Sequence, residues 1–207
     1  MGTRVAIHGA SGRLGQLIAA EAGPSFVGAV GRDGTIPDCD VVIDVSSPEG
    51  LRSLLGRLTD QPLLIGTTGE LPMDAIEAYS ARAPVALVAN FSAGVPLLLQ
   101  LIQQAVSAMP DEWRVEVVES HHDQKKDAPS GTALRMVRAV EDAGGPVSPP
   151  THSIRAGDTI GEHTVWLAGP GERIEIKHVA TKRTVFATGA LRWASWLKEQ
   201  PPGLSRP

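Results

Sequence analysis

Three glycines spaced three residues apart follow the first apolar segment of the chain. That segment, residues 4–8, is predicted to be a strand, and Gly9, Gly12 and Gly15 lead from it into a helical repeat of apolar residues. Glycines at such a turn let a pyrophosphate approach the backbone amides of the helix N-terminus, which carries partial positive charge. A lone glycine motif is also found in plain turns, but the strand–turn–helix context favours a dinucleotide-binding site.

The rest of the first half alternates between short apolar runs and helical segments. The apolar runs cover residues 26–30, 41–45, 63–65 and 85–89. Helical periodicity falls between them, near residues 48–58 and 73–82. Short buried strands joined by helices are typical of a parallel sheet that is covered on both faces, so the first half is predicted to be a Rossmann-type α/β domain.

The second half of the chain has a different period. Residues 94–108 are predicted to form a long apolar helix, and residues 187–198 a closing helix. Strands are expected between them at residues 114–120, 152–156, 163–168 and 173–179. In the last strand, Ile174, Ile176 and Val179 are expected on a buried face, opposite Arg173, Glu175 and Lys177. The predicted fold class is therefore α/β, with a second α+β domain built on a mixed, largely antiparallel sheet.

Composition narrows the class of protein. A formal net charge of −4 argues against a nucleic-acid-binding protein. The longest apolar stretches, such as residues 95–102, are far shorter than the ~20 residues that span a bilayer, so no membrane association is expected. The single cysteine, Cys39, leaves no internal disulfide, which fits a reducing compartment and predicts a cytoplasmic protein. The sequence contains no G-x-x-x-x-G-K-[ST] phosphate loop, so ATPase chemistry has no support. It also lacks the Tyr-x-x-x-Lys pair of another class of reductases.

The tip of the second strand bears on the choice of cofactor. An NAD site usually offers an acidic residue there to the ribose 2′-hydroxyl, and an NADP site offers an arginine. Here the tip contains Gly31, Arg32 and Asp33. A guanidinium fits a phosphate bidentately, so Arg32 favours NADPH. The alternative interpretation of Arg32 is a solvated turn residue, which leaves NADH open.

Most of the reactive side chains gather in one polar loop, residues 119–132, between a strand and a helix. The loop holds two imidazoles, His121 and His122, and the ammonium groups of Lys125 and Lys126, close to Ser130 as a candidate N-cap. These groups suit a small dicarboxylate substrate. A histidine that titrates near ~6.5 can donate a proton at neutral pH, and a lysine can hold a carboxylate or supply a second proton.

Other interpretations of this loop compete with catalysis. A metal site is disfavoured, because adjacent residues on a strand point to opposite faces and the neighbouring lysines repel a cation. A capped structural turn remains an alternative. The remaining histidines lie in strand patterns and are expected to be structural: His8, His152, His163 and His178.

Several motifs occur in an order that resembles a known family. They are the glycine turn, Gly66-Thr67-Thr68-Gly69, Asn90-Phe91-Ser92-x-Gly94, the block from Glu119 to Thr132, and Arg155-x-Gly157 with Gly161-Glu162-His163-Thr164-Val165. With these motifs the chain resembles the 4-hydroxy-tetrahydrodipicolinate reductases of bacterial and plant lysine biosynthesis, from the first strand to the final helix. The block at residues 119–132 is highly specific to that family, whereas the glycine turn is shared with many Rossmann enzymes.

The resemblance implies a nicotinamide-binding domain of residues 1–92 plus 184–207, and a substrate-binding and oligomerisation domain of residues 93–183 that builds a homotetramer. It also implies reduction of 4-hydroxy-2,3,4,5-tetrahydrodipicolinate to tetrahydrodipicolinate by NAD(P)H, with loss of the 4-hydroxyl as water. His121 matches the family's proton donor and acceptor, and Lys125 its second proton donor. The implied substrate contacts are His122, Gly131 and Thr132. The implied cofactor contacts are Gly9, Ala10, Ser11, Gly12, Arg13, Leu14, Arg32, Gly66, Thr67, Thr68, Val88, Ala89, Asn90 and Phe91.

The chain also departs from the family pattern. Between Asp33 and Asp40 almost nothing remains of the usual second helix and loop, and Gly31 stands where many members carry the acidic ribose ligand. Two other classes of protein therefore stay open. One is a different Rossmann-type dehydrogenase that acts on an amino acid or a sugar, and the other is a cofactor-binding or sensor homologue without turnover.

Overall fold

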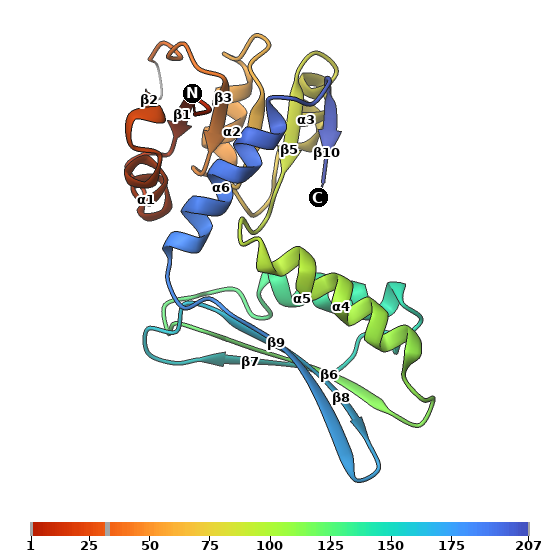
Figure 1. The fold of residues 1–207 in the computed structure, drawn as a ribbon. Coiled ribbons are helices and arrows are strands. Elements are labelled where there is room, and N and C mark those ends of the chain that lie inside the picture. Colours follow the sequence, from red (N-terminus) through yellow and green to blue (C-terminus); the bar gives the residue numbers. More distant parts are fainter. Residues whose placement is uncertain (1, 32–33, 207) are drawn as a thin grey trace. The chain divides into compact units, whose positions relative to one another are not determined.

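The computed structural model describes residues 2–31 and 34–206. The chain divides into two compact units, one of residues 1–92 with 184–207 and one of residues 93–183 (Figure 1). Unit 1 is therefore built from both ends of the chain, and unit 2 is a continuous insertion between its parts.

Unit 1 is built on a six-stranded parallel sheet with the strand order β10-β5-β4-β3-β1-β2. Its strands are β1 (Val5–His8), β2 (Phe26–Val30), β3 (Val41–Asp44), β4 (Leu63–Ile65), β5 (Pro84–Leu87) and β10 (Gly203–Ser205). Its α-helices are α1 (Arg13–Ala22), α2 (Pro48–Leu55), α3 (Met73–Ser80) and α6 (Thr184–Leu197), with a short 3-10 turn at Gly23–Ser25. The parallel sheet confirms the Rossmann-type fold class that the alternating pattern predicts.

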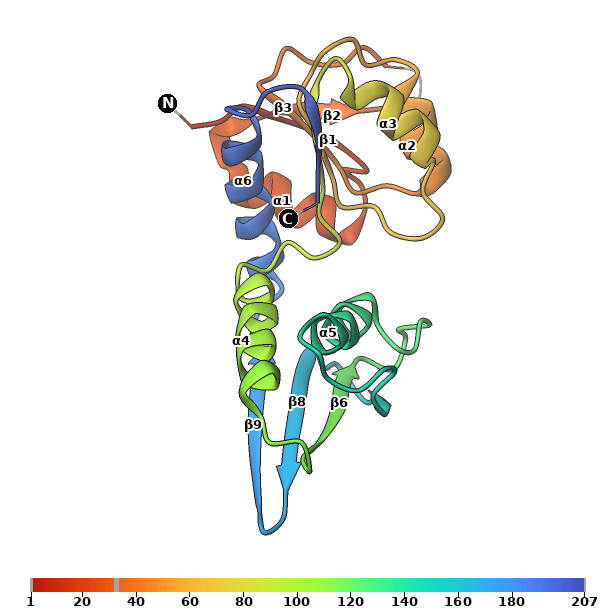
Figure 2. The same ribbon diagram turned by 90° about the vertical axis from the view of Figure 1, so that its right-hand side faces the viewer.

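Helices cover both faces of this sheet. Within unit 1, α1 and α6 lie side by side on one face, and α2 and α3 lie on the other (Figure 2). Unit 1 has one apolar core on each face of the sheet, and alternate residues of β1 belong to different cores. Val5 and Ile7 pack toward α1 and α6, and Ala6 packs toward α2 and α3. Burial on both faces explains why these strands are short apolar runs rather than alternating ones.

The edge strand β10 is not expected from the sequence, which predicts only a closing helix over residues 187–198. Instead the chain turns and pairs parallel to β5, with Leu204 opposite Val85. The paired residues are 119 positions apart in the sequence, so no local pattern signals the pairing.

Unit 2 is a four-stranded mixed sheet with two helices on one face (Figure 1). It contains α4 (Gly94–Ala108), β6 (Arg114–His121), α5 (Gly131–Asp142), β7 (Thr151–Arg155), β8 (Glu162–Gly169) and β9 (Glu172–Val179). The strand order is β7-β6-β8-β9; β7 runs parallel to β6, and the other pairs are antiparallel. This mixed, largely antiparallel sheet confirms the second part of the predicted fold class.

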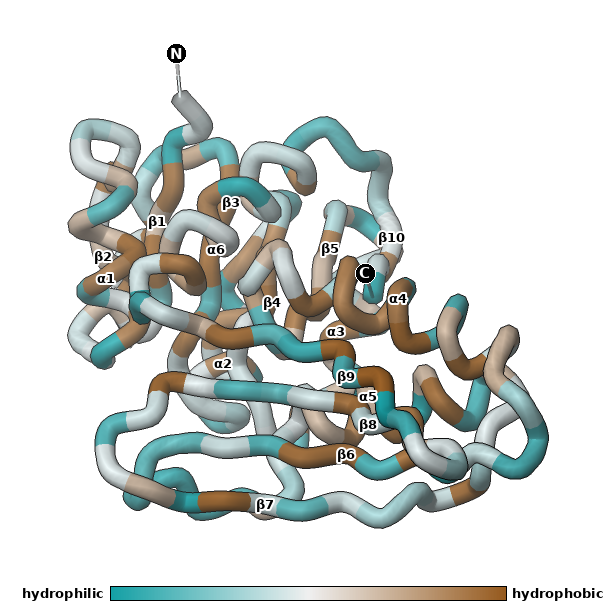
Figure 3. Tube along the Cα trace, turned by 60° about the horizontal axis from the view of Figure 1, so that its bottom comes forward, coloured by the Kyte–Doolittle hydropathy of each residue, from teal (hydrophilic) through white to brown (hydrophobic). Residues whose placement is uncertain are grey.

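The predicted burial in β9 is wrong at two of its three apolar residues, Ile174 and Val179. Isoleucines alternate with charged residues along the strand (Figure 3), and the register puts Ile174 and Ile176 opposite the inward-facing Leu167 and Val165. Val179 is out of phase with them because the side-chain period of a strand is two, and it is 42% exposed. Ile174 is also 50% exposed and lies next to the hairpin that joins β8 to β9, whereas Ile176 packs against the core of unit 2.

None of the helices in the described part of the chain is long and apolar enough to cross a membrane.

Candidate functional site

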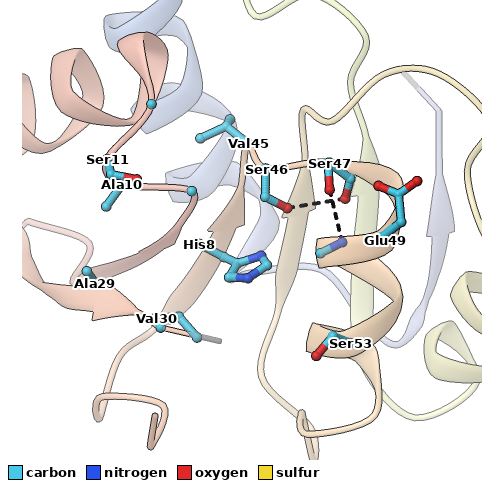
Figure 4. Close-up of a pocket in the computed structure, with 14 residues that line it drawn as sticks. His8, Ala10, Ser11, Ala29, Val30, Val45, Ser46, Ser47, Glu49 and Ser53 are labelled. Carbon is cyan, nitrogen blue, oxygen red and sulfur yellow. Dashed lines mark hydrogen bonds between the residues drawn. The ribbon is translucent and has the colours of Figure 1, made fainter. Parts of the chain in front are cut away.

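Unit 1 contains a cleft of about 820 Å³ at the carboxyl ends of its first strands (Figure 4). The cleft is lined by residues that follow β1, β2 and β3 and by the first turns of α2. The lining residues are His8, Gly9, Ala10, Ser11, Gly12, Ala29, Val30, Gly31, Val45, Ser46, Ser47, Glu49, Gly50 and Ser53. The carboxyl edge of an open parallel sheet is where α/β proteins bind ligands.

The glycine turn gives the cleft a backbone wall. Gly9 has a φ of +85°, and a Cβ placed on it would lie 2.6 Å from the carbonyl oxygen of Val45. A Cβ on Gly15 would lie 2.2 Å from the carbonyl oxygen of Gly9, so α1 can approach the turn only with glycine there. Gly12 is the N-cap of α1, and no side chain of the described residues caps this helix start. The amides of its first turn therefore fit a pyrophosphate, and the residues present fit a dinucleotide cofactor.

A buried carboxylate anchors the floor of the cleft. Asp44, at the end of β3, is fully buried, and one of its oxygens lies 2.7 Å from Nδ1 of His8 and accepts a 2.6 Å hydrogen bond from the Ser46 hydroxyl. Its other oxygen accepts a 2.5 Å hydrogen bond from the Thr67 hydroxyl. The network ties the ends of β1, β3 and β4 together at one edge of the sheet. His8 is expected to be structural, and this contact fits that role, yet its ring also lines the cleft.

The predicted cofactor contacts fall into three groups. Four of them line the cleft: Gly9, Ala10, Ser11 and Gly12. A second group lies outside that lining, in the first turn of α1 or directly after β4 and β5: Arg13, Leu14, Gly66, Thr67, Thr68, Val88, Ala89, Asn90 and Phe91. Arg32 lies outside the described residues. The segments after β4 and β5 share the carboxyl edge of the sheet with the cleft, because all strands of this sheet are parallel.

Two of the predicted contacts have buried apolar side chains. Phe91 is 3% exposed, and a Cβ on Gly66 would lie 2.4 Å from its ring. Val88 is 2% exposed in the same core. At these positions only backbone atoms are left to contact a ligand.

Several lining residues were missed by the sequence reasoning. Ala29, Val45, Ser46, Ser47 and Ser53 carry no motif of their own. Only their position in the fold identifies them as lining residues. They lie at or just after the carboxyl ends of parallel strands, or on the helix that follows such a strand. Once the strands are assigned, that rule would find most of them.

The reactive loop of unit 2 begins at the end of β6. Alternate residues of this strand are buried, which places Val115, Val117, Glu119 and His121 on the helix-covered face. His121 Nδ1 lies 2.5 Å from Oε2 of Glu119, and the His121 side chain is 11% exposed. His122 follows at a half-buried position where a turn begins, with its carbonyl accepting from the amide of Lys125 at 3.1 Å.

Glu119 is the centre of an ion-pair network. It is fully buried and accepts two hydrogen bonds from the Arg155 guanidinium, at 3.0 and 2.7 Å, and one from the amide of Ser130 at 3.2 Å. Burial favours the neutral acid, but hydrogen bonds from Arg155, Ser153 and His121 outweigh it and lower the pKa of Glu119 to about 2. The carboxylate is therefore ionised at neutral pH.

Opposing influences act on His121. Burial lowers its pKa, the Glu119 carboxylate raises it, and the charges of Lys125 and Arg155 lower it further, with a net decrease. Behind it on β8 lies His163, whose ring centroid is 5.0 Å away in an edge-on arrangement. Burial, followed by the nearby His121 and His178, lowers the pKa of His163 to about 4.

The other predicted residues lie close to this network. The Lys125 ammonium donates to both oxygens of Asp127, at 2.8 and 2.9 Å, and its side chain is 23% exposed. The Ser130 hydroxyl accepts from the amide of Ala133 at 3.2 Å, which confirms it as the N-cap of α5. Gly131 is exposed and Thr132 buried in the first turn of that helix. The structure thus brings His121, His122, Lys125, Gly131 and Thr132 together at one end of unit 2, and we call them the histidine–lysine cluster.

Comparisons with known proteins agree with this arrangement. The family model described as "Dihydrodipicolinate reductase, C-terminus" matches residues 94–206. A 4-hydroxy-tetrahydrodipicolinate reductase of Stenotrophomonas maltophilia (strain K279a) is 42% identical over 231 aligned positions, which cover 98% of this chain and 95% of that protein. The protein of the same name from Halorhodospira halophila is 36% identical over 258 positions, which cover 99% and 97%. Both alignments are longer than the chain's 207 residues, so these relatives carry segments that this chain lacks.

A solved structure shares the fold. The dipicolinate-bound dihydrodipicolinate reductase from Paenisporosarcina sp. TG-14 superposes with a TM-score of 0.71 at 20% identity, covering 100% of this chain and 98% of that one.

Proposed function

The chain belongs to the 4-hydroxy-tetrahydrodipicolinate reductase family and is an oxidoreductase of the diaminopimelate route to lysine, and from that premise we propose that its two units divide the chemistry. Unit 1 binds the nicotinamide cofactor, and unit 2 binds the substrate and supplies the protons. This division is supported by where the two candidate binding features lie. The start of α1 at Gly12, which has no side-chain cap, lies in unit 1, and the histidine–lysine cluster lies wholly in unit 2.

In unit 1 the backbone amides after Gly9 would hold the pyrophosphate of the cofactor at the start of α1. The bound nicotinamide supplies the hydride. The segments after β4 and β5, among them Gly66-Thr67-Thr68 and Val88-Ala89-Asn90-Phe91, complete the proposed binding site along the same sheet edge.

In unit 2 the cluster would hold a ring dicarboxylate and neutralise charge. Two carboxylates need two anion sites, which His122, Lys125 and the amides of Gly131 and Thr132 supply. Hydride addition leaves negative charge on the conjugated carbon–nitrogen system of the substrate, so a positioned acid must donate a proton as the bonds change. We assign that donation to His121 and a second one to Lys125, whose ammonium is partly exposed.

The test of this proposal is an assay of turnover with freshly generated 4-hydroxy-tetrahydrodipicolinate. The reaction is monitored by the absorbance of the reduced nicotinamide. We expect NADPH to be oxidised only when substrate is present. Pyridine-2,6-dicarboxylate, a flat mimic of the substrate ring, should inhibit this reaction competitively with substrate. Tight cofactor binding without turnover would instead identify a sensor. Turnover of an amino acid or sugar, unaffected by the mimic, would identify another dehydrogenase.

The cofactor preference rests on Arg32, and we propose NADPH. Arg32→Ala should weaken NADPH binding by roughly 1–3 kcal/mol, as expected for a charge-assisted hydrogen bond to phosphate, and should leave NADH binding nearly unchanged. Calorimetric titration of both cofactors into both proteins measures this difference. Equal effects on the two cofactors would reject the role of Arg32.

We also propose a cytoplasmic homotetramer assembled through unit 2. The face of its sheet opposite α4 and α5 bears half-exposed apolar side chains, Ile154 at 48% and Val179 at 42%, beside the stacked pair of Arg173 and Trp166. Light scattering during gel filtration measures the mass of the assembly, and a monomeric mass would contradict this proposal.

A further inference from the structure

The environment of His121 determines which of its nitrogens faces a substrate. Glu119 and His121 lie two residues apart on β6, so their side chains project from the same face of the sheet. Because an ionised carboxylate can only accept hydrogen bonds, the 2.5 Å contact requires a proton on Nδ1 of His121. The other ring nitrogen, Nε2, lies near Gly161, where an added Cβ would be 3.2 Å from it.

Glu119 is itself held in one orientation. Arg155 binds both of its oxygens in a bidentate pair, and the Ser130 amide donates to Oε1. The Arg155 guanidinium also donates to the carbonyl of Asp127, in the loop that carries Lys125. The carboxylate therefore links β6, β7 and the start of α5, and its rotation would break contacts to all three.

We propose that Glu119 is a positioning residue of the reductase, clamped by Arg155, and that it holds His121 with the proton on Nδ1 so that Nε2 delivers a proton to the substrate. This inference rests on the proposed role of His121. In the proposed step the proton leaves Nε2 of the imidazolium for the substrate, and the neutral ring retains its Nδ1 proton. Glu119 stabilises the imidazolium before the transfer and keeps the ring in place after it.

The charge balance around the ring explains why a carboxylate is needed. His121 faces Lys125 from the loop, Arg155 from β7 and His163 from β8, with His178 on β9 beyond. The first two are cations, and burial also disfavours a charged ring. Glu119 is the group in this set that favours the imidazolium, so its removal would lower the pKa of His121 further.

A second glutamate–histidine pair on the same strands provides a matched control. Glu116 on β6 accepts a 2.9 Å hydrogen bond from His152 on β7, but this pair is exposed and faces the opposite side of the sheet. Glu119→Gln and Glu116→Gln thus make the same chemical change in the same strand, one beside His121 and one away from it.

The experiment compares these two variants with the wild type by steady-state kinetics across pH and by nitrogen-15 NMR of the histidine rings. For Glu119→Gln we expect kcat to fall by roughly 10²-fold or more, because catalytic histidines that lose their orienting carboxylate lose activity on this scale. The substrate KM should change little, and the pH limb assigned to His121 should move to lower pH. Glu119→Asp, which retains the charge, should restore part of kcat, and Glu116→Gln should match the wild type.

The NMR measurement remains decisive even if Glu119→Gln does not fold. In the wild-type protein the account requires the Nδ1-protonated form of neutral His121, and the Nε2-protonated form would overturn it. Unchanged kcat and pH profile in folded Glu119→Gln would also overturn it. A failure of the proposed role of His121 can be told apart from a failure of this inference. In that case His121→Ala would retain wild-type activity, whichever ring nitrogen carries the proton in the wild-type protein.

Discussion

At the scale of single residues, the histidines behind the cluster make folding depend on pH. His163 is 3% exposed, and its pKa is lowered to about 4 by burial first and then by the neighbouring His121 and His178. An unfolded chain binds a proton at this residue below its ordinary pKa of ~6.5, whereas the folded chain does not until about pH 4. The free energy of unfolding should therefore fall as the pH drops through this window.

Between ~pH 6.5 and 4, His163 should change the free energy of unfolding by at most ~3–4 kcal/mol, at ~1.4 kcal/mol per pKa unit. Urea unfolding at a series of pH values measures it. His163→Gln should flatten the dependence in this window, whereas His152→Gln, at an exposed position of β7, should keep it. Equal slopes in wild type and His163→Gln would contradict this assignment. Glu119 acts in a lower window, since its stabilising charge is lost only as the pH falls below about 4.5 toward 2.

At the scale of elements, the turn between β1 and α1 is the most tightly constrained junction. Backbone atoms surround the Cα of Gly15, with Gly9 and Ala10 closer to an added Cβ than any real contact allows. Neighbouring side chains cannot relieve this clash by moving, so α1 must shift away from the turn that it supports.

Gly15→Ala should therefore lower the free energy of unfolding by about 1–3 kcal/mol, as for an overpacked site, and weaken NADPH binding. Gly56→Ala is the control, because Gly56 has a helical φ of −70° and its nearest contact to an added Cβ is at an ordinary 3.6 Å. Denaturant unfolding and calorimetry measure the two effects. A Gly15→Ala protein as stable as Gly56→Ala would show that the turn tolerates a side chain.

At this scale the sequence predicts features that are formed by residues close together in the chain, and it does not predict features formed by distant segments. The β1–turn–α1 unit and the capped start of α5 at Ser130 are encoded by neighbouring residues, and both were predicted. The pairing of β10 with β5 and the clamp of Arg155 on Glu119 depend on strand register between distant segments, so no local pattern shows them. His8 illustrates the same limit, because its contact with Asp44 and its place in the cleft both require β3 beside β1.

At the scale of the whole molecule, the order of the chain matches the proposed division of labour. Unit 2 is inserted between β5 and α6, and the chain then returns to unit 1, where α6 packs on α1 and β10 extends the sheet. Ala187, Ala190 and Ala194 of α6 belong to the same core as Val5 and Ile7 of β1. Unit 1 is therefore incomplete without residues from both sides of unit 2, even though each unit has its own core.

The most direct test of this division is a paired measurement of cofactor binding and turnover on variants from each unit. His121→Ala and Lys125→Ala should bind NADPH with Kd values within about threefold of wild type, and their kcat should fall by roughly 10²–10⁴-fold, the range typical of lost general acids. Gly15→Ala should show the reverse, with weakened NADPH binding as its main defect. Near-wild-type turnover in both cluster variants, or loss of cofactor affinity in His121→Ala equal to that in Gly15→Ala, would contradict the account.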